Sequence, residues 1–81
     1  MLNLQAAKDL LKKVKQARQT SNYAELIITG SLVENGTEDP LTVTIEVDSI
    51  GPKYITGYAQ ELGIVTKFYA SNDIQFEAII R

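Results

Sequence analysis

The first part of the chain carries hydrophobic side chains at spacings of three and four residues. This is the period of an amphipathic helix, and on a helical wheel these positions fall on one face about 140° wide. The pattern predicts a helix over residues 4–19, with Asn3 as a candidate N-cap and the polar residues 20–22 ending it. The hydrophobic face consists of Leu4, Ala7, Leu10, Leu11, Val14 and Ala17.

Hydrophobic and polar residues then alternate in two segments on either side of an Asn35-Gly36 dipeptide. Alternation with a period of two is typical of a strand with one buried face, and Asn-Gly between two such runs predicts a β-hairpin. A loop at Asn35-Gly36 would place Ile28 opposite Val43, and a loop one residue further along would place Ile28 opposite Ile45. Both registers bury the same side chains. The two predicted strands cover residues 23–33 and 41–48.

Residues 52–62 predict a second, shorter helix. Pro52 suits the first helical position and Gly63 suits the position just after a helix. Gly57 in the middle would weaken such a helix by about 1 kcal/mol relative to alanine. The helical spacing is carried by Ile55, Tyr58, Ala59 and Leu62.

The C-terminal segment predicts a second hairpin, with residues 71–73 as a three-residue loop. In this register Lys67 faces Glu77, which is a favourable cross-strand pair of opposite charges. A two-residue loop would instead oppose lysine to phenylalanine, so the three-residue loop is favoured. The same register opposes Phe68 to Phe76, Ala70 to Ile74, Val65 to Ile79, and Ile64 to Ile80.

These elements predict a single α+β domain over residues 1–81. Its order is helix–hairpin–helix–hairpin (αββαββ), a four-stranded antiparallel sheet with two helices packed on one face. The predicted core consists of Leu4, Ala7, Leu11, Val14, Leu26, Ile28, Leu32, Val43, Ile45, Val47, Ile55, Leu62, Phe68, Phe76 and Ile80.

Composition narrows the chemistry that the chain can perform. The 81 residues include no cysteine, which removes disulfides, thiol nucleophiles and cysteine-ligated metals, and no histidine, which removes the commonest general base. The sequence therefore predicts a non-enzymatic protein that works by contact, with no cofactor and no metal. Neither a signal peptide nor a membrane-spanning run is found, so the expected location is cytoplasmic.

The outer face of the predicted sheet is the first candidate site. Glu25, Glu46 and Asp48 point to it in either register of the first hairpin. A loop at Asn35-Gly36 opposes Glu25 to Glu46 and a loop one residue further along opposes it to Asp48, and repulsion between the opposed carboxylates calls for a compensating cation or a basic partner. Hydrophobic side chains share this face, so the sequence predicts that the sheet binds a protein partner or a second copy of the chain. The candidate partner-binding residues are Ile27, Val65, Ile79, Tyr69, Glu25 and Glu46.

The predicted N-terminal helix offers an alternative site. Residues 1–20 contain five cations and one anion, while the rest of the chain is acidic. A row of cations along one edge of a helix can follow a phosphate backbone, so binding of nucleic acid is the second hypothesis. It is less favoured because the whole chain has a net charge of −2 and a pI near 4.9. The residues concerned are Lys8, Lys12, Lys15 and Arg18.

Overall fold

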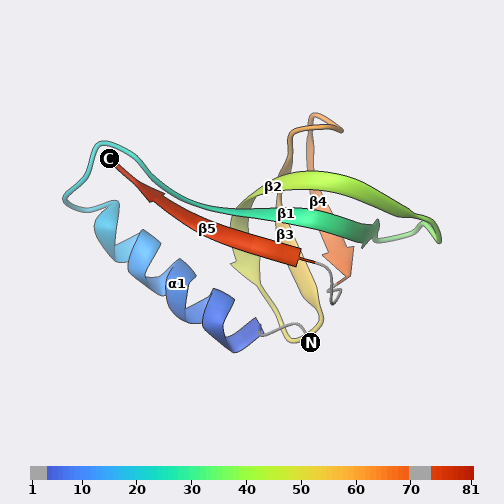
Figure 1. Ribbon diagram of the computed structural model, residues 1–81, viewed down its shortest axis with the longest axis horizontal. Helices are drawn as coiled ribbons and strands as arrows, with labels where there is room; N and C mark the ends of the chain where they lie inside the picture. The colour runs from blue at the N-terminus through green and yellow to red at the C-terminus, as the bar shows by residue number, and fades with distance from the viewer. Residues whose placement is uncertain (1–3, 70–73) are drawn as a thin grey trace.

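The computed structural model describes residues 4–69 and 74–81 (Figure 1). This part of the chain forms one helix and five antiparallel strands in one sheet, so the predicted arrangement of two helices and four strands is wrong. The class remains α+β with an antiparallel sheet. The elements are α1 (Leu4–Ala17), β1 (Ala24–Glu34), β2 (Pro40–Ile50), β3 (Tyr54–Ala59), β4 (Ile64–Tyr69) and β5 (Ile74–Ile80).

The predicted N-terminal helix is confirmed, although it ends at Ala17 rather than at residue 19. Its hydrophobic face packs against β1, β2 and β5, which places the helix along one end of the sheet (Figure 1). Ala7 and Val14 are fully buried there and Leu11 nearly so, because their spacing aligns them on the face that meets the strands.

β1 organises the sheet because it pairs with three other strands. One side of β1 pairs with β2, and the other side pairs first with β5 and then, at Val33 and Glu34, with the end of β4. β2, β3 and β4 pair in succession, so the sheet curls until β4 meets the end of β1. The buried side chains of all these strands fill the space inside the curl.

The hairpin of β1 and β2 is confirmed, and its register is the second of the two expected ones. Ile28 lies opposite Ile45, and residues 35–39 connect the strands. Gly36 has a φ of 91°, a left-handed conformation that glycine adopts without strain.

The predicted helix over residues 52–62 is wrong, since residues 54–59 form β3 and residues 60–63 form a turn. Ile55, Gly57 and Ala59 point inward and are buried, while their neighbours point outward. Residues 54–59 therefore carried the alternation of a strand as well as the spacing of a helix. They are also rich in the β-branched and aromatic residues that strands favour. Gly63, with a φ of 70°, ends the turn rather than a helix.

The predicted C-terminal hairpin is also wrong. β4 pairs with β3, placing Phe68 opposite Ile55, and β5 pairs with β1, placing Phe76 opposite Ile28. In the described part of the chain β4 and β5 do not contact each other. β4 thus pairs with the strand that precedes it in the chain, and β5 pairs with the distant β1. Ala70 and the loop 71–73 lie outside the described residues.

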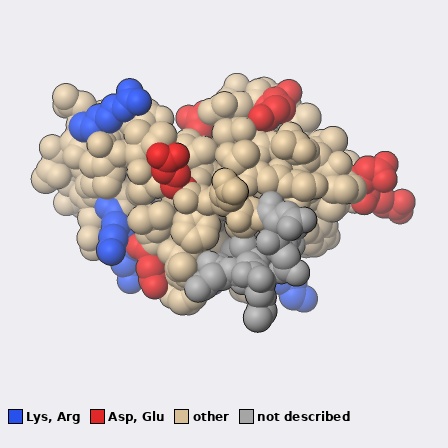
Figure 2. Space-filling model, in the orientation of Figure 1, with Lys and Arg blue, Asp and Glu red and all other residues tan. Residues whose placement is uncertain are grey.

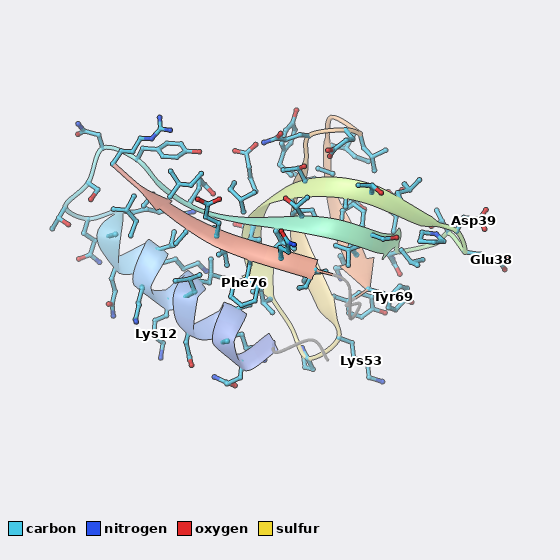
Figure 3. The ribbon with its side chains drawn as sticks, in the orientation of Figure 1. Lys12, Glu38, Asp39, Lys53, Tyr69 and Phe76 are labelled. Carbon is cyan, nitrogen blue, oxygen red and sulfur yellow. The ribbon has the colours of Figure 1, made fainter. Side chains whose placement is uncertain are left out.

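This rearrangement alters the periphery of the predicted core. Leu62 lies in the turn after β3 and is 38% exposed, while Ile80 lies on β5 and is 51% exposed. Phe76 is only partly buried and lies between β5 and α1 (Figure 3). The side chain of Leu4 lies outside the described residues, and every other predicted core residue is buried.

Candidate functional site

A groove of about 440 Å³ lies on the outer face of the sheet. It runs from the residue that follows α1 across β1, β2 and β3 to β4, so it collects side chains from widely separated parts of the sequence. Its walls are formed by Arg18, Glu25, Glu46, Val47, Asp48, Gly57, Tyr58 and Val65.

The strand pairings show which residues lie side by side in the middle of the groove. Glu46 on β2 lies between Ile27 on β1 and Tyr58 on β3, and Tyr58 in turn lies opposite Val65 on β4. Tyr58 is 40% exposed and Val65 is 64% exposed, so one wall of the groove is apolar and open to a ligand. A β-bulge between Val47 and Ser49 carries Asp48 at the groove's edge.

The charges in the groove are only partly compensated within the chain. The Arg18 guanidinium lies 3.2 Å from the Glu25 carboxylate and also donates a hydrogen bond of 2.9 Å to the Ala24 carbonyl oxygen. This contact gives Glu25 a compensating cation, and Glu46 lies opposite Ile27 rather than opposite Glu25. Among the described residues, the side chains of Glu46 and Asp48 make no ion pair or hydrogen bond. The groove therefore keeps two uncompensated carboxylates beside an apolar wall.

Three of the six predicted partner-binding residues, Glu25, Glu46 and Val65, meet in this groove. Ile27 lies beside it, opposite Glu46, whereas Ile79 lies on the other side of Glu25, on β5. The predicted pair of Val65 with Ile79 does not form. Tyr58 was not among the predicted site residues, because its segment was predicted to be a helix. The alternation of buried and exposed positions around Gly57 was the signal that could have placed it on the outer face.

Tyr69, the sixth predicted residue, lies four residues beyond Val65 on β4, or about 13 Å along the strand. Its hydroxyl shares a hydrogen bond of 3.3 Å with the Tyr54 hydroxyl, and the two ring centroids are 4.8 Å apart. The hydrogen bond to Tyr54 raises the pKa of Tyr69 above its ordinary value. Tyr69 thus belongs to a separate aromatic pair, near the end of the molecule opposite the C-terminal end of α1 (Figure 3).

The basic residues of the N-terminal segment separate into two groups. Lys8, Lys12 and Lys15 line a shallow groove of about 340 Å³ along α1, and Lys12 points away from the sheet (Figure 3). Arg18 is held at the outer-face groove by Glu25 instead. At the far end of the molecule, Glu38 and Asp39 form an acidic tip on the β1–β2 hairpin (Figures 2 and 3).

The described residues contain no group of three or more histidine, cysteine, aspartate or glutamate side chains placed to hold a metal ion. Within residues 4–69 and 74–81, no helix is long and apolar enough to cross a membrane. Comparison with protein-family models, with curated proteins and with solved structures finds no match.

Proposed function

We propose that the chain is a non-enzymatic interaction module that binds a basic segment of a protein partner in the outer-face groove. The observation that carries this proposal is the meeting of Glu46, Asp48, Tyr58 and Val65 around one concave space. Carboxylates beside exposed apolar surface match the two parts of a lysine or arginine side chain, which has an apolar stem and a cationic head.

The geometry supports a specific mode of binding. The apolar stem of the partner's side chain packs on Val65 and the Tyr58 ring, and its cationic head reaches the carboxylates of Glu46 or Asp48. Hydrogen bonds between a guanidinium and a carboxylate are stronger than neutral ones, and a cation over a tyrosine ring adds about 0.5–1 kcal/mol at an exposed site. A volume of about 440 Å³ accommodates one or two such side chains.

A charge reversal at Glu46 tests the proposal. The probe is a synthetic peptide of alternating arginine and leucine, with the matching glutamate–leucine peptide as its control. We expect the arginine peptide alone to bind the wild-type chain, and Glu46→Lys to weaken that binding at least tenfold, because it places like charges together. Fluorescence anisotropy measures the affinity, and NMR shifts of Tyr58 and Val65 locate the site.

Glu38→Lys is the matched control for this experiment. It changes the net charge by the same amount, but it lies on the exposed hairpin tip outside the groove. Equal weakening by Glu38→Lys and Glu46→Lys would mean that the peptide responds to overall charge, and the groove would lose its proposed role.

Nucleic acid is the second candidate, favoured by the groove that Lys8, Lys12 and Lys15 line on α1. Phosphate contacts produce affinity that falls steeply with salt. If this candidate is correct, replacing all three lysines by alanine strongly weakens binding to mixed single-stranded RNA and DNA and reduces the salt dependence of the binding that remains. We expect the triple substitution instead to leave binding of the arginine peptide unchanged within twofold. A salt titration of wild type and variant decides between the candidates.

A further inference from the structure

β5 is an edge strand of the sheet. It pairs with β1 on one side, and no other strand of the described residues pairs with its opposite edge. Figure 1 shows β5 in front of β1, with no other described element drawn over it. α1 packs against the face of the strands rather than along this edge (Figure 1). The backbone of β5 is therefore accessible along one side.

The hydrogen bonds to β1 determine which backbone groups of β5 remain unpaired. Just beyond the end of β5, Tyr23 and Arg81 exchange two backbone hydrogen bonds, of 2.8 and 3.4 Å. In an antiparallel pair, residues that exchange hydrogen bonds alternate with residues whose N–H and C=O groups point away from the partner strand. Counting back from Arg81 in the continuous register with β1, the groups that point to the open edge belong to Ile80, Ala78, Phe76 and Ile74.

This edge lacks the protection found at the other long strand of the hairpin. Residues 40–44 of β2 have no partner in β3, but Pro40 offers no N–H there and the Thr44 amide donates to the Glu61 carboxylate at 2.6 Å. Residues 74–80 contain no proline and no lysine, and their pairing with β1 has no bulge. An edge strand without such devices is a template for adding another strand.

The side chains of β5 are complementary to a second, antiparallel copy of the same strand. Ile80 lies on the face that packs against the core, yet it is 51% exposed, while Phe76 and Ala78 on the same face are only partly buried. On the outer face, Glu77 and Arg81 are exposed and carry opposite charges. Because an antiparallel copy reverses their order, it brings the unlike charges of the two molecules together.

We propose that two copies of this chain associate by antiparallel pairing of their β5 strands, with Ala78 of one copy opposite Ala78 of the other. This register places Phe76 of each copy opposite Ile80 of the other, so the exposed Ile80 side chains become covered. The opposed residues are those with free N–H and C=O groups, which then exchange hydrogen bonds between the copies. On the outer face, Arg81 lies opposite Gln75 and diagonally within reach of Glu77.

The neighbouring registers are less favourable. A shift of one residue would oppose core-facing side chains to outward-facing ones. A shift of two residues in one direction opposes Glu77 to Glu77, and like charges directly opposite each other are destabilising. The same shift in the other direction confines the pairing to residues 77–81 and leaves Phe76 without a partner. Since both copies contribute the same strand, the association closes as a dimer. It does not depend on the outer-face groove or on the proposed peptide binding.

Ile80→Lys tests the association. The fold tolerates lysine at this half-exposed position, whereas in the dimer the lysine is buried against Phe76 of the other copy without a counter-charge. We expect dimer formation to weaken at least tenfold. Ile64→Lys is the matched control, because Ile64 is 48% exposed and lies on β4, away from β5, and we expect it to dimerise like wild type. Multi-angle light scattering gives the masses, and circular dichroism verifies folding. A wild-type chain that is monomeric at millimolar concentration, or equal weakening by both variants, would overturn the proposal.

Cysteine cross-linking tests the register independently. The chain contains no cysteine, so one introduced thiol per molecule reports on one position. Ala78→Cys places the two thiols on directly opposed residues, whose Cα atoms are about 5.5 Å apart, a separation that suits a disulfide. We expect mild oxidation to link this variant into a dimer, and to link Glu77→Cys, whose two copies lie diagonally, at least tenfold more slowly. Non-reducing electrophoresis measures both rates. Faster linking of Glu77→Cys than of Ala78→Cys would overturn the proposed register.

Discussion

Replacing Gly57 by alanine is expected to destabilise the fold by about 3 kcal/mol or more. An added Cβ would collide with the backbone carbonyl oxygen of Glu46 and lie 2.7 Å from Cγ2 of Ile45. Overpacking a core commonly costs about 1–3 kcal/mol when side chains can shift, and here the main obstacle is backbone that belongs to a paired strand. β2 and β3 would have to separate at the point where the sheet curls. Urea unfolding followed by circular dichroism measures the loss.

Gly51→Ala is the control for this substitution. An added Cβ at Gly51 would lie 3.7 Å from the Tyr54 carbonyl oxygen, which is ordinary van der Waals contact. We expect a change of less than about 0.5 kcal/mol there, because the neighbouring atoms leave room for the added methyl group. Equal stability losses at Gly51 and Gly57 would contradict the close approach of β2 to β3.

Phe68→Ala is expected to cost about 3–5 kcal/mol, which is typical of removing a buried phenylalanine. Phe68 is fully buried; it lies opposite Ile55 on β3 and opposite Glu34 where β4 meets the end of β1. A chain of 81 residues has a total stability of about 4–12 kcal/mol, so the variant loses a large part of it. The midpoint of urea unfolding gives the value.

The other phenylalanine gives an internal comparison. Phe76 is only partly buried, on the edge strand β5, so Phe76→Ala removes fewer contacts and we expect a clearly smaller loss of stability. A loss at Phe76 as large as that at Phe68 would contradict the partial burial of Phe76.

Elements determined by local pattern could be predicted from the sequence, and elements determined by competition between distant strands could not. The helix and the β1–β2 hairpin follow from spacing within a short window and from one turn dipeptide. β3 was misread because its residues fit both periods, and burial of Gly57 against β2 decided between them. The choice of β1 rather than β4 as the partner of β5 depends on the curl of the whole sheet, which no local window contains.

The residues of the candidate site could likewise be predicted only in part. Glu25, Glu46 and Val65 could be assigned to the outer face because alternation fixes the face of a strand residue whatever its partner. Their meeting in one groove depends on the order of the strands, which the sequence pattern mispredicted. Asp48 was assigned to the same face and reaches the groove at a bulge, whereas Tyr58 entered the groove through β3. Ile79 and Tyr69 were excluded from it by the pairings of β5 and β4.

The position of β1 has a consequence for how the chain folds. β1 is the first strand in the sequence, but one of its sides is completed by β5, whose residues lie roughly 50 positions further along. Structures dominated by such long-range pairings fold slowly, because a large loop must close before its contacts stabilise anything. During synthesis, β1 and β2 leave the ribosome before β5. Until β5 follows, the backbone along one edge of β1 lacks its hydrogen-bonding partner. We therefore expect cooperative folding only after β5 is released, and aggregation of fragments that end before residue 74.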